Sequence, residues 1–193
     1  MGEAAPGLDF LQSFLPDYEE TGSLYPHLSW HLSLFALRLG KTDLALSMFE
    51  NRFRPDLGKQ APFFSMVDAG AFNWRCQLRG IGGREAGLRE VSAFADAEFA
   101  TPGLGFANVH AAYAWAAAGA FEALSRHVEA CRDLAVRTVH PSAPVVHAIC
   151  AGVQAFALGD YAGAAADLEA VLPKLASIGG SNAQRDAVME TLV

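Results

Sequence analysis

Positive charge is scarce in this sequence, and charge of either sign is limited. Lys and Arg number 14 against 21 Asp and Glu, giving a formal net charge of −7, and charged residues make up only 18% of the 193-residue chain. Nucleic-acid-binding proteins usually carry a basic stripe, and no run of Lys or Arg interleaved with aromatics occurs here. Nucleic acid is therefore excluded from the expected partners.

Long apolar runs, a secretion signal and a disulfide framework are also lacking. The uncharged stretch Thr101–Phe121 is broken by Pro, Gly, Asn and His, whereas a membrane-spanning helix needs about 20 predominantly apolar residues. The N-terminal MGEAAPGLDF lacks the basic and then apolar order of a signal peptide. The three cysteines, Cys76, Cys131 and Cys150, are odd in number and widely spaced, which indicates reduced thiols. We expect a cytoplasmic protein with no membrane partner.

Clusters of Val, Ile and Thr, which favour strands, are few. Apolar residues nevertheless make up 52% of the chain, and much of this content is alanine. Alanine is the best helix former and lets helices approach closely. The composition therefore predicts an all-α fold in which helix packs on helix.

Glycines recur with a period of about forty residues, at Gly40, Gly80, Gly119 and Gly159. Each follows one helical pattern and precedes another. A glycine in the left-handed region can end the first helix, and a short turn then sends the chain back antiparallel. This forty-residue period predicts one domain over 1–193, an α-solenoid of antiparallel helix pairs. Its units are expected at 24–58, 61–100, 104–140 and 144–178, with a partial unit at 181–193.

Within these units, Asp43 and Asp160 stand where an acidic residue supports the start of a second helix. The last predicted helix ends at Val193 without a glycine cap and with apolar residues. We therefore expect a further segment, a partner or a second copy of the chain, forming a homodimer, to cover this end. Helices are predicted at 8–15, 25–39, 43–54, 62–79, 84–98, 105–118, 120–138, 145–158, 161–175 and 181–193.

The fourth unit, AGVQAFALGDYAGAAADLEAVL, resembles a tetratricopeptide repeat. Its small residues, its turn and its apolar stripe fall at the packing positions of that motif, namely Gly152, Gly159, Tyr161, Ala164, Leu168 and Leu172. The usual repeat is 34 residues long, so the units here are longer. The resemblance implies a TPR-like α-solenoid, a right-handed superhelical array.

Two stretches, YPHLSWHLSLFALRLGKTDLALSMFE and IGGSNAQRDAVMETL, resemble the tetratricopeptide repeat protein 38 family of bacteria and animals. The segments DAGAFNWRCQL and FANVHAAYAWAAAG between them are also similar to that family. The resemblance covers most of the chain and would correspond to the C-terminal half of a full family member. Asn182 stands where histidine is expected. The resemblance implies an α-solenoid of unassigned biochemistry and brings no catalytic residues.

Polar residues form two rows when the units are aligned on their glycines. Nine places before each glycine stand His31, Ala71, His110 and Cys150; three places earlier stand Leu28, Asp68, Ala107 and His147. Positions three apart share one side of a helix, and the first helices of stacked units lie side by side. We therefore expect the polar members of these rows to converge on the concave face, where many solenoids bind.

Three interpretations of this polar stripe remain open. The histidines could be packed and hydrogen-bonded between helices, or they could contact a peptide or organic ligand. A metal site is the third, because His27 and His31 have the i, i+4 spacing that presents two imidazoles together; HLSWH lacks the glutamate of an HExxH motif. Cys150 with His147 is an i, i+3 pair that offers a weak basis for nucleophilic catalysis.

The segment Gly80–Glu85 lacks the lysine and Ser or Thr of a phosphate loop, so no cofactor is expected. At Gly179–Asp186, Ser181 or Asn182 can cap the last helix, and its first turn could instead hold an anion. The leading hypothesis is a non-enzymatic scaffold whose groove binds a protein segment, a peptide or a small ligand. The alternative is an enzyme or metal-binding protein with a His- and Asp-lined site. The predicted groove residues are His27, Trp30, His31, Asp68, Trp74, Arg75, Asn108, His110, His147, Gln184 and Arg185.

Overall fold

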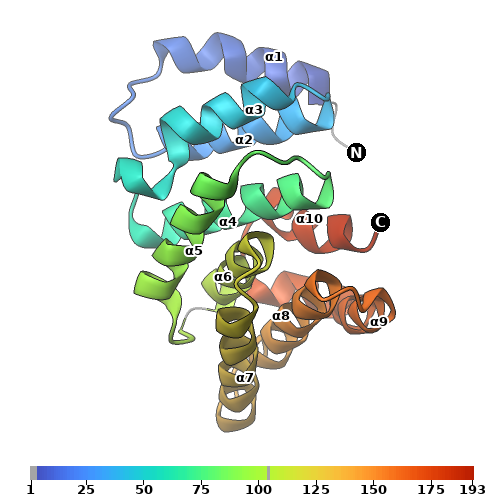
Figure 1. Ribbon diagram of the computed structural model, residues 1–193. Helices are drawn as coiled ribbons and strands as arrows, with labels where there is room; N and C mark the ends of the chain where they lie inside the picture. The colour runs from blue at the N-terminus through green and yellow to red at the C-terminus, as the bar shows by residue number, and fades with distance from the viewer. Residues whose placement is uncertain (1–3, 104) are drawn as a thin grey trace.

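The computed structural model describes residues 4–103 and 105–193, which form helices and no strand (Figure 1), confirming the all-α prediction. The predicted unit boundary at 104 and the first three residues of the predicted domain lie outside the described residues. The α-helices are α1 (Ala4–Phe14), α2 (Tyr25–Arg38), α3 (Thr42–Met48), α4 (Pro62–Leu78), α5 (Glu85–Phe99), α6 (Gly105–Ala118), α7 (Phe121–Arg137), α8 (Ala143–Ala157), α9 (Tyr161–Val171) and α10 (Asn182–Thr191). Short helical turns are η1 (Leu15–Asp17), η2 (Phe49–Phe53), η3 (Pro55–Leu57) and η4 (Leu172–Ile178).

The four periodic glycines make the same turn. Gly40, Gly80, Gly119 and Gly159 all have positive φ, between 64° and 85°, which costs little only for a residue without a Cβ. Each glycine N–H bonds to the carbonyl three residues earlier, and the next N–H bonds to the carbonyl five residues before it. These two bonds are the Schellman motif. The expected helix-ending role of the glycines is therefore confirmed.

Each of these turns joins two helices that pack together: α2 with α3, α4 with α5, α6 with α7 and α8 with α9. The first helices also contact one another in chain order, α2 with α4, α4 with α6 and α6 with α8. Figure 1 shows α1–α3 at one end, α7–α9 at the other, and α10 lying beside α4. The last helix thus returns to the middle of the molecule, where it contacts α4 and α8.

Some helix boundaries differ from the prediction for local reasons. The first helix starts at Ala4 rather than at residue 8, because Pro6 lies in its first turn, where its missing N–H is not needed. The predicted helix 161–175 changes at Val171 into the 3-10 turn η4, where Pro173 stands in the first turn. The predicted helix 43–54 ends in a π-type turn, η2, that buries Phe49 and Phe53.

Candidate functional site

Two predicted site residues, His27 of α2 and Asp68 of α4, meet as a pair. His27 Nδ1 lies 3.0 Å from Oδ1 and 3.1 Å from Oδ2 of Asp68. The Asp68 side chain is 0% exposed, and Gln60 Nε2 donates a second hydrogen bond to it, at 3.3 Å. His27 lines a cavity of about 330 Å³ that also includes Lys59, Gln60 and Phe64. His27 and Asp68 are both predicted groove residues, but only Asp68 belongs to one of the two polar rows.

The pKa values of His27 and Asp68 are both raised. Burial raises the pKa of the Asp68 carboxyl, and the hydrogen bonds and charge of its partners offset only part of that shift. Burial alone would lower the pKa of His27, but the hydrogen bond and charge of Asp68 raise it above the ordinary value. A buried carboxylate that holds Nδ1 fixes the ring orientation and leaves Nε2 to interact with another molecule.

His31 lies beside this pair but stays outside its hydrogen bonds. Its ring centroid is 4.8 Å from that of His27, edge to face. Burial, followed by the charges of His27 and Arg75, lowers the pKa of His31 to about 4. His31 is therefore a neutral, half-buried imidazole at neutral pH.

The rest of the predicted stripe does not form one open surface. Asn108 and His110 are each 1% exposed, and His110 Nδ1 bonds within its own helix to the Phe106 carbonyl at 2.9 Å. The physical reason is that α6 packs against α4, α5, α7 and α8, so every residue from Phe106 to Ala117 is buried. His147 is half-buried on α8.

The predicted aromatic and arginine anchors of the groove are also inside the protein, so the expectation that they line an open groove is wrong. Trp30 is 0%, Trp74 1% and Arg75 2% exposed. Trp74 Nε1 donates to Thr191 Oγ1 at 2.9 Å, and Arg75 Nε donates to Glu190 at 3.0 Å. Trp74 and Arg75 thus hold α10 against α4, and neither side chain is exposed to bind a ligand.

Gln184 and Arg185 serve the start of α10. Ser181 caps the helix, and the Gln184 side chain accepts a hydrogen bond from the Ser181 N–H at 2.8 Å, which completes a capping box. Arg185 donates to the carbonyls of Gly179 and Gly180 and to Asn182 Oδ1. This N-terminus is thus occupied by its own cap, in place of the anion considered from the sequence.

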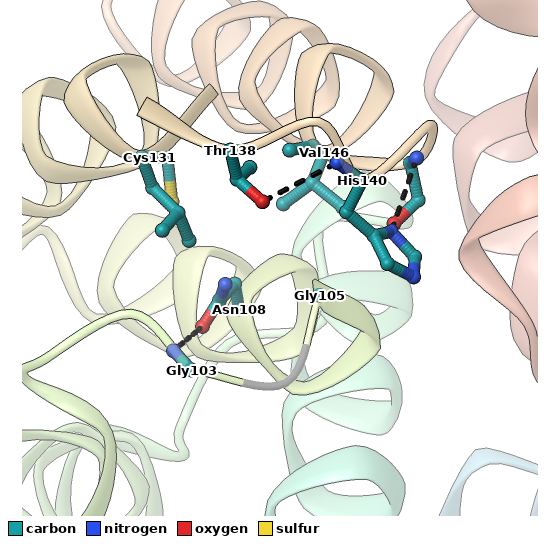
Figure 2. A pocket seen from close by; sticks show the side chains of 10 residues that line it. Gly103, Gly105, Asn108, Cys131, Thr138, His140 and Val146 are labelled. Atoms are coloured by element: carbon teal, nitrogen blue, oxygen red, sulfur yellow. Dashed lines mark hydrogen bonds between the residues drawn. The ribbon is translucent and has the colours of Figure 1, made fainter. Parts of the chain in front are cut away.

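A second cavity, of about 310 Å³, lies where α6, the end of α7 and the start of α8 meet (Figure 2). Its walls are mostly apolar, with a few polar groups. Thr138 Oγ1 accepts the His140 N–H at 3.3 Å, and His140 Nδ1 lies 2.8 Å from Ser142 Oγ. The lining residues are Gly103, Gly105, Asn108, Cys131, Leu134, Thr138, His140, Ser142, Ala143 and Val146.

Asn108 gives this cavity an unpaired donor. Its Oδ1 accepts the Gly103 N–H at 3.3 Å, which fixes the orientation of the amide. Its Nδ2 is buried and has no hydrogen-bond partner among residues 4–103 and 105–193. Figure 2 shows this nitrogen turned toward the space in front of Cys131 and Thr138. Buried polar groups are nearly always paired in folded proteins, so this donor is free to bond a ligand atom in the cavity.

One group of possible metal ligands forms within residues 4–103 and 105–193. His127 and Cys131 of α7 and Cys150 of α8 are all buried, and their ligand atoms all lie within 4.8 Å of one another. Of the polar stripe predicted from the sequence, only Cys150 belongs to this group.

The sequence-based prediction missed several of these residues. His127 and Cys131 have the same i, i+4 spacing as His27 and His31, so the motif HVEAC is the signal that could have found them. Thr138, His140 and Ser142 lie at and after the end of the predicted helix 120–138, where the sequence shows no site motif. No pattern in the sequence predicts that the segment between α7 and α8 folds over Asn108.

No model of a known protein family matches the sequence, and no solved structure matches the fold significantly. Among the described residues, none of the helices has both the length and the apolar character needed to cross a membrane.

Proposed function

We propose that this chain is a helical-repeat binding protein that takes a small, mostly apolar ligand into the cavity between α6, α7 and α8. The observation that carries the proposal is the unpaired Asn108 Nδ2, which is buried and aimed into that cavity. The ligand carries a hydrogen-bond acceptor, such as a carbonyl oxygen, next to an apolar group. This keeps the predicted binding role but places it in a pocket instead of along an open groove.

The proposed architecture is a TPR-like α-solenoid, a right-handed array related to the tetratricopeptide repeat protein 38 family. Its support is the repeated Schellman turn at Gly40, Gly80, Gly119 and Gly159, together with first helices that contact one another in sequence order. Solenoids stack units in this way because one helix pair cannot bury its apolar face alone. A cytoplasmic location, protein or peptide partners, self-association and a lack of nucleic-acid or membrane partners belong to the same proposal.

The energetics favour a ligand that accepts a hydrogen bond. A buried donor without a partner costs about 1–3 kcal/mol relative to one that is paired. A ligand oxygen at Asn108 Nδ2 recovers that energy, while Leu134, Ala143 and Val146 bury its apolar part. The cavity volume, about 310 Å³, falls at the lower end of the range of small-molecule sites.

Octanamide tests the proposal because its carbonyl can accept from Asn108 and its chain is apolar. Isothermal titration calorimetry should detect binding to the wild type, and Asn108→Leu should weaken it about tenfold, the equivalent of roughly one hydrogen bond. Val146→Phe, which fills the cavity, should abolish it. The control Asn51→Leu replaces an exposed amide and should bind as the wild type does. Equal affinity in Asn108→Leu would contradict the proposal.

A second candidate is general-base catalysis, which the His27–Asp68 pair supports. A buried carboxylate that orients an imidazole is the arrangement that many hydrolases use to activate a nucleophile or water. If this pair is catalytic, His27→Gln should remove most of the p-nitrophenyl acetate hydrolysis by the purified chain. The control His140→Gln replaces an exposed histidine and should retain it. Identical rates in the wild type and His27→Gln would leave binding as the only candidate.

A further inference from the structure

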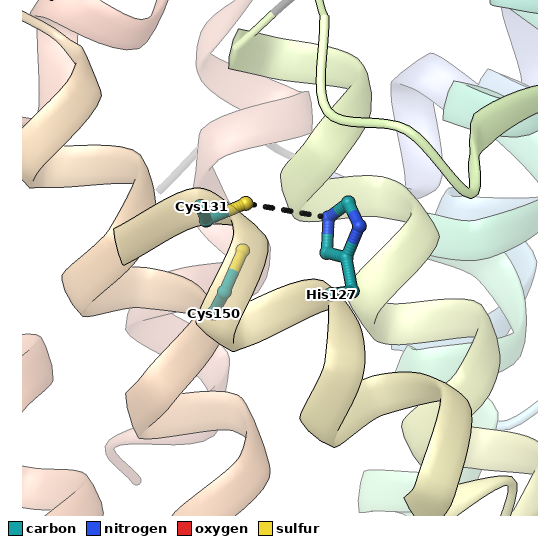
Figure 3. A group of neighbouring side chains, drawn as sticks. All are labelled: His127, Cys131 and Cys150. Carbon is teal, nitrogen blue, oxygen red and sulfur yellow. Dashed lines mark hydrogen bonds between the residues drawn. The ribbon is translucent and has the colours of Figure 1, made fainter. Parts of the chain in front are cut away.

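Three side chains from two antiparallel helices converge beside the cavity. His127 and Cys131 stand one turn apart on α7, and Cys150 reaches them from α8 (Figure 3). Cys131 Sγ lies 3.5 Å from His127 Nε2, and all three ligand atoms fit within 4.8 Å. The helix packing therefore brings together donors that are distant in the sequence.

We propose that His127, Cys131 and Cys150 bind a zinc ion. Cysteine sulfur and histidine nitrogen are the donors that zinc prefers in proteins, in tetrahedral geometry. Bond lengths of about 2.3 Å to sulfur and 2.0–2.1 Å to nitrogen place two such donors roughly 3.5 Å apart across a tetrahedral edge. The observed distance between Cys131 Sγ and His127 Nε2 is 3.5 Å.

The fourth coordination position also has an oxygen nearby. The backbone oxygen of Asn108 lies 3.1 Å from His127 Nε2 and 3.8 Å from Cys150 Sγ. Cys131, in contrast, lines the 310 Å³ cavity, which gives an ion and a water molecule a route to the cluster. Zinc held by three side chains keeps its fourth position for such an oxygen.

The charge balance suits a buried site. Zinc displaces one proton from each of the two thiols, and the Nε2 proton that His127 donates to the Asn108 carbonyl moves to Nδ1, which frees Nε2 to bind the ion. The divalent ion, two thiolates and a neutral imidazole are together neutral, and two protons leave. Neutrality matters here because Cys131 is 2% and Cys150 0% exposed, and a net buried charge would be costly. The site is distinct from the unpaired nitrogen of Asn108, so zinc binding does not depend on the proposed ligand.

Cobalt(II) is the probe for the test, because thiolate ligands give it intense charge-transfer absorption in the near ultraviolet and a tetrahedral site gives strong visible bands. The full chain, kept reduced, should bind one equivalent, and zinc should displace it. Cys131→Ser and Cys150→Ser should weaken binding by more than the roughly 10- to 100-fold that loss of an outer-shell partner costs. The matched control is Cys76→Ser, which changes the third buried cysteine, outside the cluster, and should leave binding intact.

A measurement on the wild type removes any ambiguity from misfolded variants. At a temperature well below the unfolding midpoint, where buried thiols react through local opening, zinc should slow the alkylation of Cys131 and Cys150 by iodoacetamide much more than that of Cys76. Mass spectrometry identifies the modified peptides. A wild-type chain that takes up no cobalt, or equal alkylation of all three cysteines with and without zinc, would overturn the proposal. Octanamide binding by a chain that fails this test would leave the proposed ligand pocket standing.

Discussion

At the scale of single residues, Arg75 is a charged side chain held almost completely inside the protein. Arg75 donates to Glu190 on α10 and to the carbonyls of Ala71 and Ala183. Its partners are thus distributed over two helices that are far apart in the sequence. A buried guanidinium is stable only while such acceptors remain, because its desolvation is costly.

Glu190→Ala should lower the free energy of unfolding by about 3 kcal/mol, because it leaves the Arg75 guanidinium buried without its carboxylate. Urea denaturation followed by circular dichroism measures the change. Glu129→Ala is the control, since Glu129 pairs with Arg132 at the exposed surface and its loss should cost about 1 kcal/mol or less. Equal losses in the two variants would show that Arg75 does not depend on Glu190.

His110 should make the protein less stable in mild acid. Burial, with a smaller contribution from the Arg75 charge, lowers its pKa from 6.5 to about 4, although the bond to the Phe106 carbonyl opposes the shift. The contribution of neutral His110 to the free energy of unfolding is complete above pH 6.5. It is lost as the pH falls toward 4, because in that range the histidine binds a proton only in the unfolded chain. The loss is on the order of 3 kcal/mol at pH 4.

His110→Leu should therefore flatten the dependence of stability on pH between 6.5 and 4, as measured by urea midpoints. Some loss of stability in acid should remain in this variant, because the pKa of His31 is also lowered to about 4. His27 contributes in the opposite direction, since its raised pKa gives stability that is present below pH 6.5 and lost above its folded value. If the stability of His110→Leu fell with pH as steeply as that of the wild type, His110 would not be the cause of the acid sensitivity.

At the scale of elements, α4 and α6 approach each other closely at Gly70. A Cβ built at Gly70 would lie 2.4 Å from the His110 backbone oxygen on α6. Backbone cannot move aside as a flexible side chain can, so the two helices would have to separate. The glycine is thus required by packing, despite its cost to helix propensity.

Gly70→Ala should lower stability by about 2 kcal/mol, against the gain of about 1 kcal/mol that helix propensity alone gives alanine. Thermal unfolding followed by circular dichroism is the measurement. Gly87→Ala serves as the control, because its Cβ would meet the Phe49 ring at 3.1 Å, and a side chain can shift. We expect Gly87→Ala to be neutral or stabilising, and a stabilised Gly70→Ala would contradict the close approach.

The sequence predicts most helices correctly because the signals are local. A glycine ends a helix through its own φ, and alanine-rich periodic segments form helices regardless of their neighbours. The site is less predictable, because the polar rows include Asp68 but not its partner His27, and they cannot show which sides of α6 are covered. The cavity requires a unit joint to fold over Asn108, and the metal cluster requires the register between α7 and α8, both of which are tertiary properties.

At the scale of the whole molecule, one continuous apolar core runs through the described helices. Trp30 of α2, Trp74 of α4 and Trp115 of α6 all belong to it, and each is at most 1% exposed. Each tryptophan therefore samples a different part of the same core. Shared burial of this kind favours cooperative unfolding.

Variants that keep one tryptophan each and carry phenylalanine at the other two should all unfold in a single transition. In each variant, the midpoint from tryptophan fluorescence should coincide with the midpoint from far-ultraviolet circular dichroism in urea. The comparison is made within one variant, so the stability cost of the substitutions cancels. A lower fluorescence midpoint for the Trp30 variant alone would show that the end containing α1–α3 unfolds separately.

The contacts between α4 and α10 also set an order of events during synthesis. Trp74 meets Thr191 117 residues later, and Arg75 meets Glu190 after 115 residues. A chain that emerges from the ribosome N-terminus first can form its local helix pairs early, since their contacts close short loops. The nascent chain must nevertheless keep a guanidinium and an indole N–H of α4 hydrated until α10 has been made, so the contacts around α4 are completed only after the helix pairs on either side of it have been synthesised.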